Sequence, residues 1–231
     1  MLKSQIKNLL VVGIDTLSIA KSAKKAGYNI YAADYFGDVD LRRVCSGFRA
    51  IVKQRRGKSC GRISSKFKPE IFLKMAKFLS EKYKIDAILL SSGLDDDFNV
   101  LYDLNDLAPI LGNSPKVIAG VRKKSRFFEE LKRLGIPYPE TAIVKNIEEA
   151  KAAAAEIEYP IVVKPIRGFG GASIRIAHNT KEIERAFSEV SLLGKNVLVQ
   201  KLIEGIHASV SLLVADKDAK TLTINEQLLG L

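Results

Sequence analysis

The sequence contains no tryptophan, and it has only two cysteines and two histidines. Cys45 and Cys60 do not have the spacing of a metal-binding motif, and two histidines are too few to complete one. A structural zinc site is therefore not expected, and we assign no residue as a metal ligand. Two isolated cysteines suit a reducing compartment, which predicts a cytoplasmic protein.

Long apolar runs are also missing. None approaches the roughly 20 residues that a helix needs to cross a bilayer, so no membrane span is expected. The opening segment, MLKSQIKNLLVVGID, carries a short apolar run that ends at Gly13 without a small-residue cleavage site. This segment predicts a first β-strand rather than a signal peptide.

Acidic residues are fewer than basic ones, and the formal net charge is +11. Such a charge favours polyanionic partners: nucleotides, nucleic acid or acidic substrates. Ten cations lie between Asp40 and Glu70 without one acidic residue among them: Arg42, Arg43, Arg49, Lys53, Arg55, Arg56, Lys58, Arg62, Lys66 and Lys68. Residues 53–68 lack periodicity and predict a loop. The loop is solvated without a specific role, binds an acidic substrate, or contacts nucleic acid. Contact with nucleic acid is the weaker alternative, because few aromatic residues lie among the basic ones.

The first half of the chain alternates strand and helix patterns. Residues 8–14 and 28–34 predict buried strands, joined by a helix that ends at Gly27. Residues 70–83 predict an amphipathic helix, and residues 85–92 another buried strand. This rhythm predicts an α/β fold with a doubly wound parallel sheet over residues 1–114, and ligand-facing loops at the carboxyl ends of its strands. The acidic segment GLDDDFN follows one of these strands.

The pattern changes near residues 112–116, where we place a domain boundary. Ser114 and Pro115 predict a helix that runs to about Leu134. Strands and helices then follow in an order that predicts an α+β unit with an antiparallel sheet, including two helices that begin with capping boxes. The last segments predict a hairpin over residues 207–229 whose apolar face no helix follows. We therefore expect the chain to be a fragment, or to pair with another chain there.

The stretch IVVKPIRGFGGASIRIA, residues 161–177, has the pattern strand, lysine, glycine-rich loop, strand. It lacks the Gly-Lys-Ser/Thr of a Walker loop. The first strand, ending VVGIDT, lacks the glycines of a dinucleotide-binding loop, which leaves Asp34 as a weak candidate for a ribose contact. A glycine-rich β-hairpin remains, which either forms only a tight turn or lets backbone amides approach phosphate oxygens.

Four segments, in this order, resemble the ATP-grasp superfamily, which includes the biotin carboxylase and D-alanine–D-alanine ligase groups. They are KKSRFFEELKRLGIPYPET, YPIVVKPIRGFGGASIRIA, VLVQKLIEG and SVSLLVAD. The opening VVGIDTLSIAKSAKKAGYNIYAADYFGDVDLRR is similar to an archaeal group of uncharacterised ATP-grasp proteins. The resemblance implies a Rossmann-like pre-ATP-grasp domain (1–114), a small lid subdomain (115–199) and the start of the large subdomain (200–231).

The resemblance also implies a set of ATP contacts. Lys124, or alternatively Lys123, would reach the phosphates, and Lys164 would lie near the α-phosphate and adenine. The remaining implied contacts are the lid residues Gly168, Phe169, Gly170 and Gly171, the adenine-edge residues Gln200, Lys201, Leu202 and Ile203, and His207 where many members place a ribose-binding glutamate. A buried core histidine is an equal alternative for His207.

The implied activity is that of an ATP-dependent carboxylate–amine or carboxylate–thiol ligase that acts through an acyl phosphate. ATP and Mg²⁺ are its expected cofactors, with the metal ligands expected beyond Leu231. Small carboxylates and amines are its expected partners, and a homodimer is allowed. The alternative is a non-catalytic nucleotide- or nucleic-acid-binding protein that retains an incomplete ATP-grasp fold.

Overall fold

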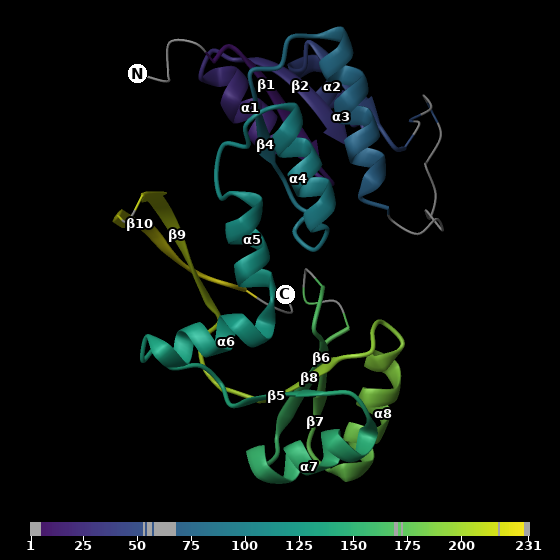
Figure 1. The fold of residues 1–231 in the computed structure, drawn as a ribbon, viewed down its shortest axis with the longest axis vertical. Helices are drawn as coiled ribbons and strands as arrows, with labels where there is room; N and C mark the ends of the chain where they lie inside the picture. The colour runs from purple at the N-terminus through teal and green to yellow at the C-terminus, as the bar shows by residue number, and fades with distance from the viewer. Residues whose placement is uncertain are drawn as a thin grey trace. The chain divides into compact units, whose positions relative to one another are not determined.

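The computed structural model describes residues 6–52, 54, 57, 68–168, 171, 173–216 and 218–228. The chain divides into two compact units (Figure 1). The first comprises Met1–Pro137 with Arg167–Gly170, and the second comprises Tyr138–Ile166 with Gly171–Leu231. Compactness therefore divides the chain after Pro137, whereas the three-domain assignment with a boundary at residue 114 stays a prediction.

A four-stranded sheet in the order β3-β2-β1-β4 forms the centre of the first unit, and all of its pairings are parallel. Its strands are β1 (Asn8–Gly13), β2 (Asn29–Asp34), β3 (Gly47–Ala50) and β4 (Ala87–Leu90). Leu9 to Val12 of β1 are almost wholly buried. Burial on both faces explains why this strand is continuously apolar. Strand β3 was not predicted, because its sequence Gly-Phe-Arg-Ala lacks an apolar run.

Helices cover both faces of this sheet, as a doubly wound fold requires. The helices of the unit are α1 (Leu17–Lys25), α2 (Val39–Val44), α3 (Glu70–Lys82), α4 (Phe98–Leu107), α5 (Pro115–Arg122) and α6 (Lys124–Arg133). Phe72 of α3 and Leu101 of α4 pack against one face, and Ala20 of α1 and Leu41 of α2 pack against the other. The predicted α/β class is confirmed.

The single helix predicted from Ser114 to about Leu134 is wrong. Lys123 has an extended backbone (φ −75°, ψ 90°) and separates α5 from α6. Gly120, just before the break, has a low helix propensity. Arg122 is the last residue of α5, and its side chain is paired with Asp96. The break places Lys124 in the first turn of α6.

The second unit contains an antiparallel sheet in the order β5-β8-β6-β7. Its strands are β5 (Thr141–Val144), β6 (Ile161–Pro165), β7 (Arg175–Ala177) and β8 (Val197–Lys201). Helices α7 (Ile147–Ile157) and α8 (Thr180–Ser191) cover one face of it (Figure 1). Both helices begin at the predicted asparagine caps, where Asn146 accepts from the amide of Glu149 and Asn179 from that of Glu182.

The last two strands form a separate antiparallel hairpin, β9 (Ala208–Ala215) and β10 (Asp218–Glu226). The predicted hairpin is therefore present. Its large apolar side chains are at least half exposed: Val210, Leu212, Leu213, Val214, Leu222 and Ile224.

Candidate functional site

The glycine-rich segment between β6 and β7 connects two antiparallel strands rather than a strand and a helix. Ile161 pairs with Ala177 and Val163 with Arg175, so β6 returns directly into β7. Gly171 has φ +69°, a left-handed conformation that glycine adopts without strain, and a side chain there would meet open space. The predicted lid residues Phe169 and Gly170 lie outside the described residues.

The strand alternation places polar groups on the face of the sheet that α7 and α8 do not cover. Val163 and Val199 point into the core under these helices, so their neighbours Lys164 and Gln200 point to the opposite face. The register sets Gln200 of β8 opposite both Thr141 of β5 and Val162 of β6. Three adjacent strands therefore contribute polar side chains to the same region: Thr141 from β5, Gln200 from β8 and Lys164 from β6.

These side chains form a hydrogen-bonded chain across the sheet. The ammonium of Lys164 donates to Oε1 of Gln200 at 2.7 Å, and Nε2 of Gln200 donates to the hydroxyl of Thr141 at 2.6 Å. The Thr141 hydroxyl in turn donates to the carbonyl of Pro139 at 2.6 Å. Because an ammonium can only donate, the amide of Gln200 is oriented with its oxygen toward the lysine and its nitrogen toward Thr141.

The surroundings of this chain combine a cation with apolar surface. Gln200 is 9% exposed and Leu198, which pairs with Lys164, is 1% exposed. Val162 and Ile176 are paired on the same face. A partly buried ammonium interacts more strongly with an anion than one in bulk water does. The chain thus places one ammonium next to apolar side chains on this face of the sheet.

Of the predicted adenine-edge residues after Gln200, two use their amides within the unit. The Lys201 amide donates to the carbonyl of Glu140 at 2.9 Å, and that of Leu202 to the carbonyl of Pro160 at 3.1 Å. The Lys201 ammonium donates to the carbonyl of Glu158 at 3.0 Å. Ile203, which is 62% exposed, remains accessible to a ligand.

His207 is exposed, so the alternative that it is a buried core histidine is wrong. Its carbonyl accepts a hydrogen bond from the amide of Gln227 at 2.7 Å, which closes the open end of the β9–β10 hairpin. The side chain is thus not part of a core.

In the first unit, Lys124 is half-buried whereas Lys123 is exposed. Burial lowers the pKa of Lys124, and the nearby guanidinium of Arg122 lowers it further, while Asp96 opposes both. The ammonium lies 5.4 Å from the centre of the Phe127 ring. Lys124 therefore has the more restricted environment of the two candidate lysines.

Sequence reasoning missed the group that surrounds Lys124. Arg122 makes a two-pronged pair with Asp96 and donates from Nη2 to the carbonyl of Gly168 at 3.1 Å. The signal was present in the acidic segment GLDDDFN, which the sequence places only at a ligand-facing loop.

Asp34 holds the loops of the first unit together. Its carboxylate accepts from the amide and hydroxyl of Thr16 at 3.0 and 2.8 Å, and from the amide of Gly37 at 2.6 Å. Asp34 is 3% exposed. A carboxylate already bound by three internal donors is poorly placed to take a ribose hydroxyl, so the weak dinucleotide alternative loses its key residue.

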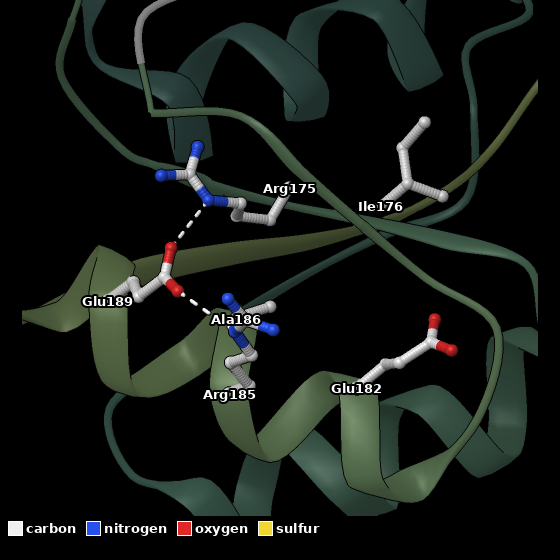
Figure 2. A pocket seen from close by; sticks show the side chains of 6 residues that line it. All are labelled: Arg175, Ile176, Glu182, Arg185, Ala186 and Glu189. Carbon is white, nitrogen blue, oxygen red and sulfur yellow. Dashed lines mark hydrogen bonds and ion pairs between the residues drawn. The ribbon is translucent and has the colours of Figure 1, made fainter.

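A cavity of about 520 Å³ lies on the outer surface of the second unit, against β7 and α8. Figure 2 shows Glu189 between two arginines, accepting from Nε of Arg175 at 2.6 Å and from Nε of Arg185 at 3.3 Å. With Glu182, which also lines the cavity, two acidic and two basic side chains balance, and ion pairs at an exposed surface contribute little to stability. We interpret the side chains that line the cavity as a surface ion-pair network that links β7 to α8.

Among the described residues, no three His, Cys, Asp or Glu side chains come together as a metal site. Within the same part of the chain, no helix is both long and apolar enough to cross a bilayer. Most of the basic stretch at residues 53–68 lies outside the described residues.

Comparisons with known proteins identify the class. Residues 121–231 match the ATP-grasp domain family. This part of the chain is therefore similar to the ATP-grasp domain family. This region includes the Lys164–Gln200–Thr141 chain and the glycine-rich hairpin.

Two curated proteins are similar in sequence to part of this chain. The large chain of carbamoyl phosphate synthase from Archaeoglobus fulgidus is 32% identical over 127 residues, which are 54% of this chain and 12% of that protein. An uncharacterised protein of Methanocaldococcus jannaschii is 27% identical over 177 residues, which are 76% of this chain and 43% of that protein. The chain thus spans less than half the length of these relatives.

Two solved structures share the fold. The biotin carboxylase domain of Hydrogenobacter thermophilus 2-oxoglutarate carboxylase, bound to MgADP, ADP and bicarbonate, has a TM-score of 0.72 at 23% identity and matches 95% of this chain and 50% of its own. The ADP complex of N5-carboxyaminoimidazole ribonucleotide synthetase has a TM-score of 0.72 at 18% identity, over 96% of this chain and 54% of its own. The predicted fold, including the Rossmann-like first part, is confirmed.

Proposed function

We propose that the chain is part of an ATP-dependent ligase that joins a carboxylate to an amine or a thiol. The observation that carries the proposal is the chain Lys164–Gln200–Thr141, which orients a partly buried cation beside a glycine-rich hairpin within a domain that matches the ATP-grasp family. Two solved structures that share the fold are named as enzymes bound to ADP.

In this proposal the sheet face that carries Lys164 receives the nucleotide. The half-buried Val162 would contact the adenine ring, and the ammonium of Lys164 would lie near the α-phosphate. Lys124 of the first unit, and the lid residues from Gly168 to Gly171, would contact the outer phosphates. Ile203 and His207 would complete the adenine and ribose contacts.

The chemistry would proceed in two balanced steps. A substrate carboxylate oxygen attacks the γ-phosphorus of ATP, forming an acyl phosphate and releasing ADP. The amine or thiol then attacks the acyl carbon, losing a proton and displacing inorganic phosphate. The residues of this chain would position the phosphates and offset their charge, which is the main contribution of a protein to phosphoryl transfer.

Magnesium is the expected counter-ion of the phosphates in such enzymes. Among the described residues no three His, Cys, Asp or Glu side chains come together, and we assign neither a ligand nor a step to a metal. The two lone cysteines support a cytoplasmic location, and small carboxylates and amines remain the proposed substrates. A homodimer is the proposed assembly, and one structural relative is described as a dimer.

The first test is a thermal melt of the chain with and without ATP, comparing Lys164→Ala with Lys181→Ala. Lys181 is an exposed lysine of the same unit, in the first turn of α8, so its loss changes the charge equally. ATP at about 100 times its dissociation constant adds about 2.7 kcal/mol to the stability of the folded state. We expect ATP to raise the melting temperature of the wild type and of Lys181→Ala, but not of Lys164→Ala. No shift in the wild type at millimolar ATP contradicts the proposed site.

The second test addresses the reaction. Carboxylates labelled with ¹⁸O, with bicarbonate among them, are incubated with ATP and an amine. An acyl phosphate transfers one labelled oxygen from the carboxylate to the released phosphate, and this transfer is read by mass spectrometry. Binding of ATP without labelled phosphate for any acid of the panel favours the non-catalytic nucleotide-binding alternative.

A further inference from the structure

The acidic segment Asp95–Asp97 of the first unit has a definite role in the structure. Asp97 caps α4 by accepting from the amide of Val100 at 3.1 Å. Asp96 accepts from Arg122 at both of its oxygens, with Nε to Oδ1 at 2.8 Å. The segment therefore connects the beginning of α4 to the last residue of α5.

Arg122 makes a third hydrogen bond, to the backbone of the glycine-rich segment. Its Nη2 donates to the carbonyl of Gly168 at 3.1 Å, in addition to the pair with Asp96. The side chain of Arg122 is 22% exposed and that of Asp96 is 30% exposed. A planar guanidinium gripped at two atoms by a carboxylate has little rotational freedom, so its remaining donor has a fixed direction.

The residue before Gly168 is held independently. The guanidinium of Arg167 lies over the ring of Phe98, 5.9 Å from its centre. Phe98 is the first residue of α4 and Arg122 the last of α5. Two consecutive residues at the start of the glycine-rich segment thus contact two different helices of the first unit, to which Arg167–Gly170 belong.

We propose that Arg122 is a positioning residue: paired with Asp96, it holds the carbonyl of Gly168 and so fixes the start of the glycine-rich segment beside the end of α5. This role rests on the proposed function, because the segment matters for activity only when it meets a nucleotide. Arg122 itself need not contact the ligand. Its contribution is to reduce the number of conformations from which the segment binds phosphates.

The anchoring is tested without nucleotide by brief digestion with trypsin. Cleavage after Arg167 breaks the Arg167–Gly168 bond, and a protease cuts such a bond only when the segment opens. We expect Arg122→Gln and Asp96→Asn each to accelerate this cleavage about tenfold, the equivalent of one lost charge-assisted hydrogen bond of about 1.4 kcal/mol. Mass spectrometry quantifies the peptide that ends at Arg167.

The matched control is Arg126→Gln, which removes one exposed cation from α6. It should leave cleavage after Arg167 unchanged. Cleavage after Arg133, at the end of α6, serves as an internal reference, because general unfolding of either variant would accelerate both cuts. Arg122→Lys keeps the charge but not the planar fork, and we expect intermediate protection. Unchanged cleavage after Arg167 in Arg122→Gln overturns the anchoring.

ATP affinity then separates this inference from the proposed function. We expect Arg122→Gln to weaken ATP binding about tenfold and Arg126→Gln to leave it unchanged. If the wild type binds ATP and Arg122→Gln binds it equally well despite faster cleavage, the positioning role is wrong while the proposed function stands. If the wild type does not bind ATP, the proposed function fails and the positioning role falls with it, although the cleavage result still reports the anchor.

Discussion

Lys164 and Gln200 are 36 residues apart in the sequence, yet the ammonium of one donates to the amide oxygen of the other at 2.7 Å. The contact exists because β6 and β8 are neighbours in the antiparallel sheet, with Val162 opposite Gln200 and Lys164 opposite Leu198. On the same face, the hydroxyl of Thr141 accepts a hydrogen bond from Nε2 of Gln200 and so orients that amide. Three strands thus cooperate to place one cation.

Replacement of Gln200 tests this relationship. Gln200→Leu removes one acceptor of Lys164 and the donor to Thr141, so the ammonium loses one of the contacts that position it. We expect ATP affinity to fall about tenfold, or about 1.4 kcal/mol, in a calorimetric titration. Gln54→Leu, a glutamine of the first unit with an exposed hydrogen bond to the carbonyl of Phe36, should bind ATP as the wild type does. Equal affinity in both variants would show that the amide does not orient the lysine.

Asp34 should be important for stability rather than for binding. Asp34→Ala leaves two amides and the buried hydroxyl of Thr16 without their acceptor. Since each unsatisfied buried group costs about 1–3 kcal/mol, we expect the free energy of unfolding to fall by about 3 kcal/mol or more in urea denaturation. The control Asp40→Ala removes an exposed carboxylate whose ion pair with Lys21 spans 3.7 Å, and should cost about 0.5 kcal/mol or less. A similar loss in both variants contradicts this role.

The cap of α8 should stabilise the second unit. Asn179 accepts from the amide of Glu182 at 3.1 Å, and Glu182 accepts from the amide of His178 at 2.8 Å. Asn179→Ala removes the first of these bonds, and we expect a loss of about 1 kcal/mol in chemical denaturation. Ser188→Ala, at an exposed position within the same helix, should be neutral or slightly stabilising because alanine favours the helix. A neutral Asn179→Ala would mean that the cap is replaced by solvent.

The thiol of Cys45 should react slowly. Burial raises its pKa from 9.0 to about 12, and the charge of Asp34 adds to this effect. At pH 8 the folded thiol therefore stays protonated, and alkylation in a Cys60→Ser background should be much slower than in urea. The sign also predicts that stability is full below pH 9 and declines above it, as the unfolded thiol ionises and the folded one does not. Equal alkylation rates in folded and unfolded protein would contradict the assignment.

Much of the fold could be predicted from local patterns. The continuous apolar run of β1 indicated a strand covered on both faces, and asparagine followed three residues later by glutamate marked the first turns of α7 and α8. The glycine-rich hairpin was identified because a strand, rather than a helix, follows its glycines. Helix α5 was predicted to continue into α6, because the break at Lys123 depends on contacts of Arg122 with a distant loop.

The candidate site divides in the same way. The sequence by itself determined which residue types are available: Lys124 and Lys164 as cations, a glycine-rich segment, and a polar residue in strand β8, since these follow from order and spacing along the chain. Only the tertiary structure decided that Gln200 bonds Lys164, that Asp34 binds internal amides, and that Arg122 reaches Gly168. The physical reason is that hydrogen bonds form between groups within about 3 Å, and sheet register and helix packing bring together residues whose separation in the sequence carries no signal of their contact.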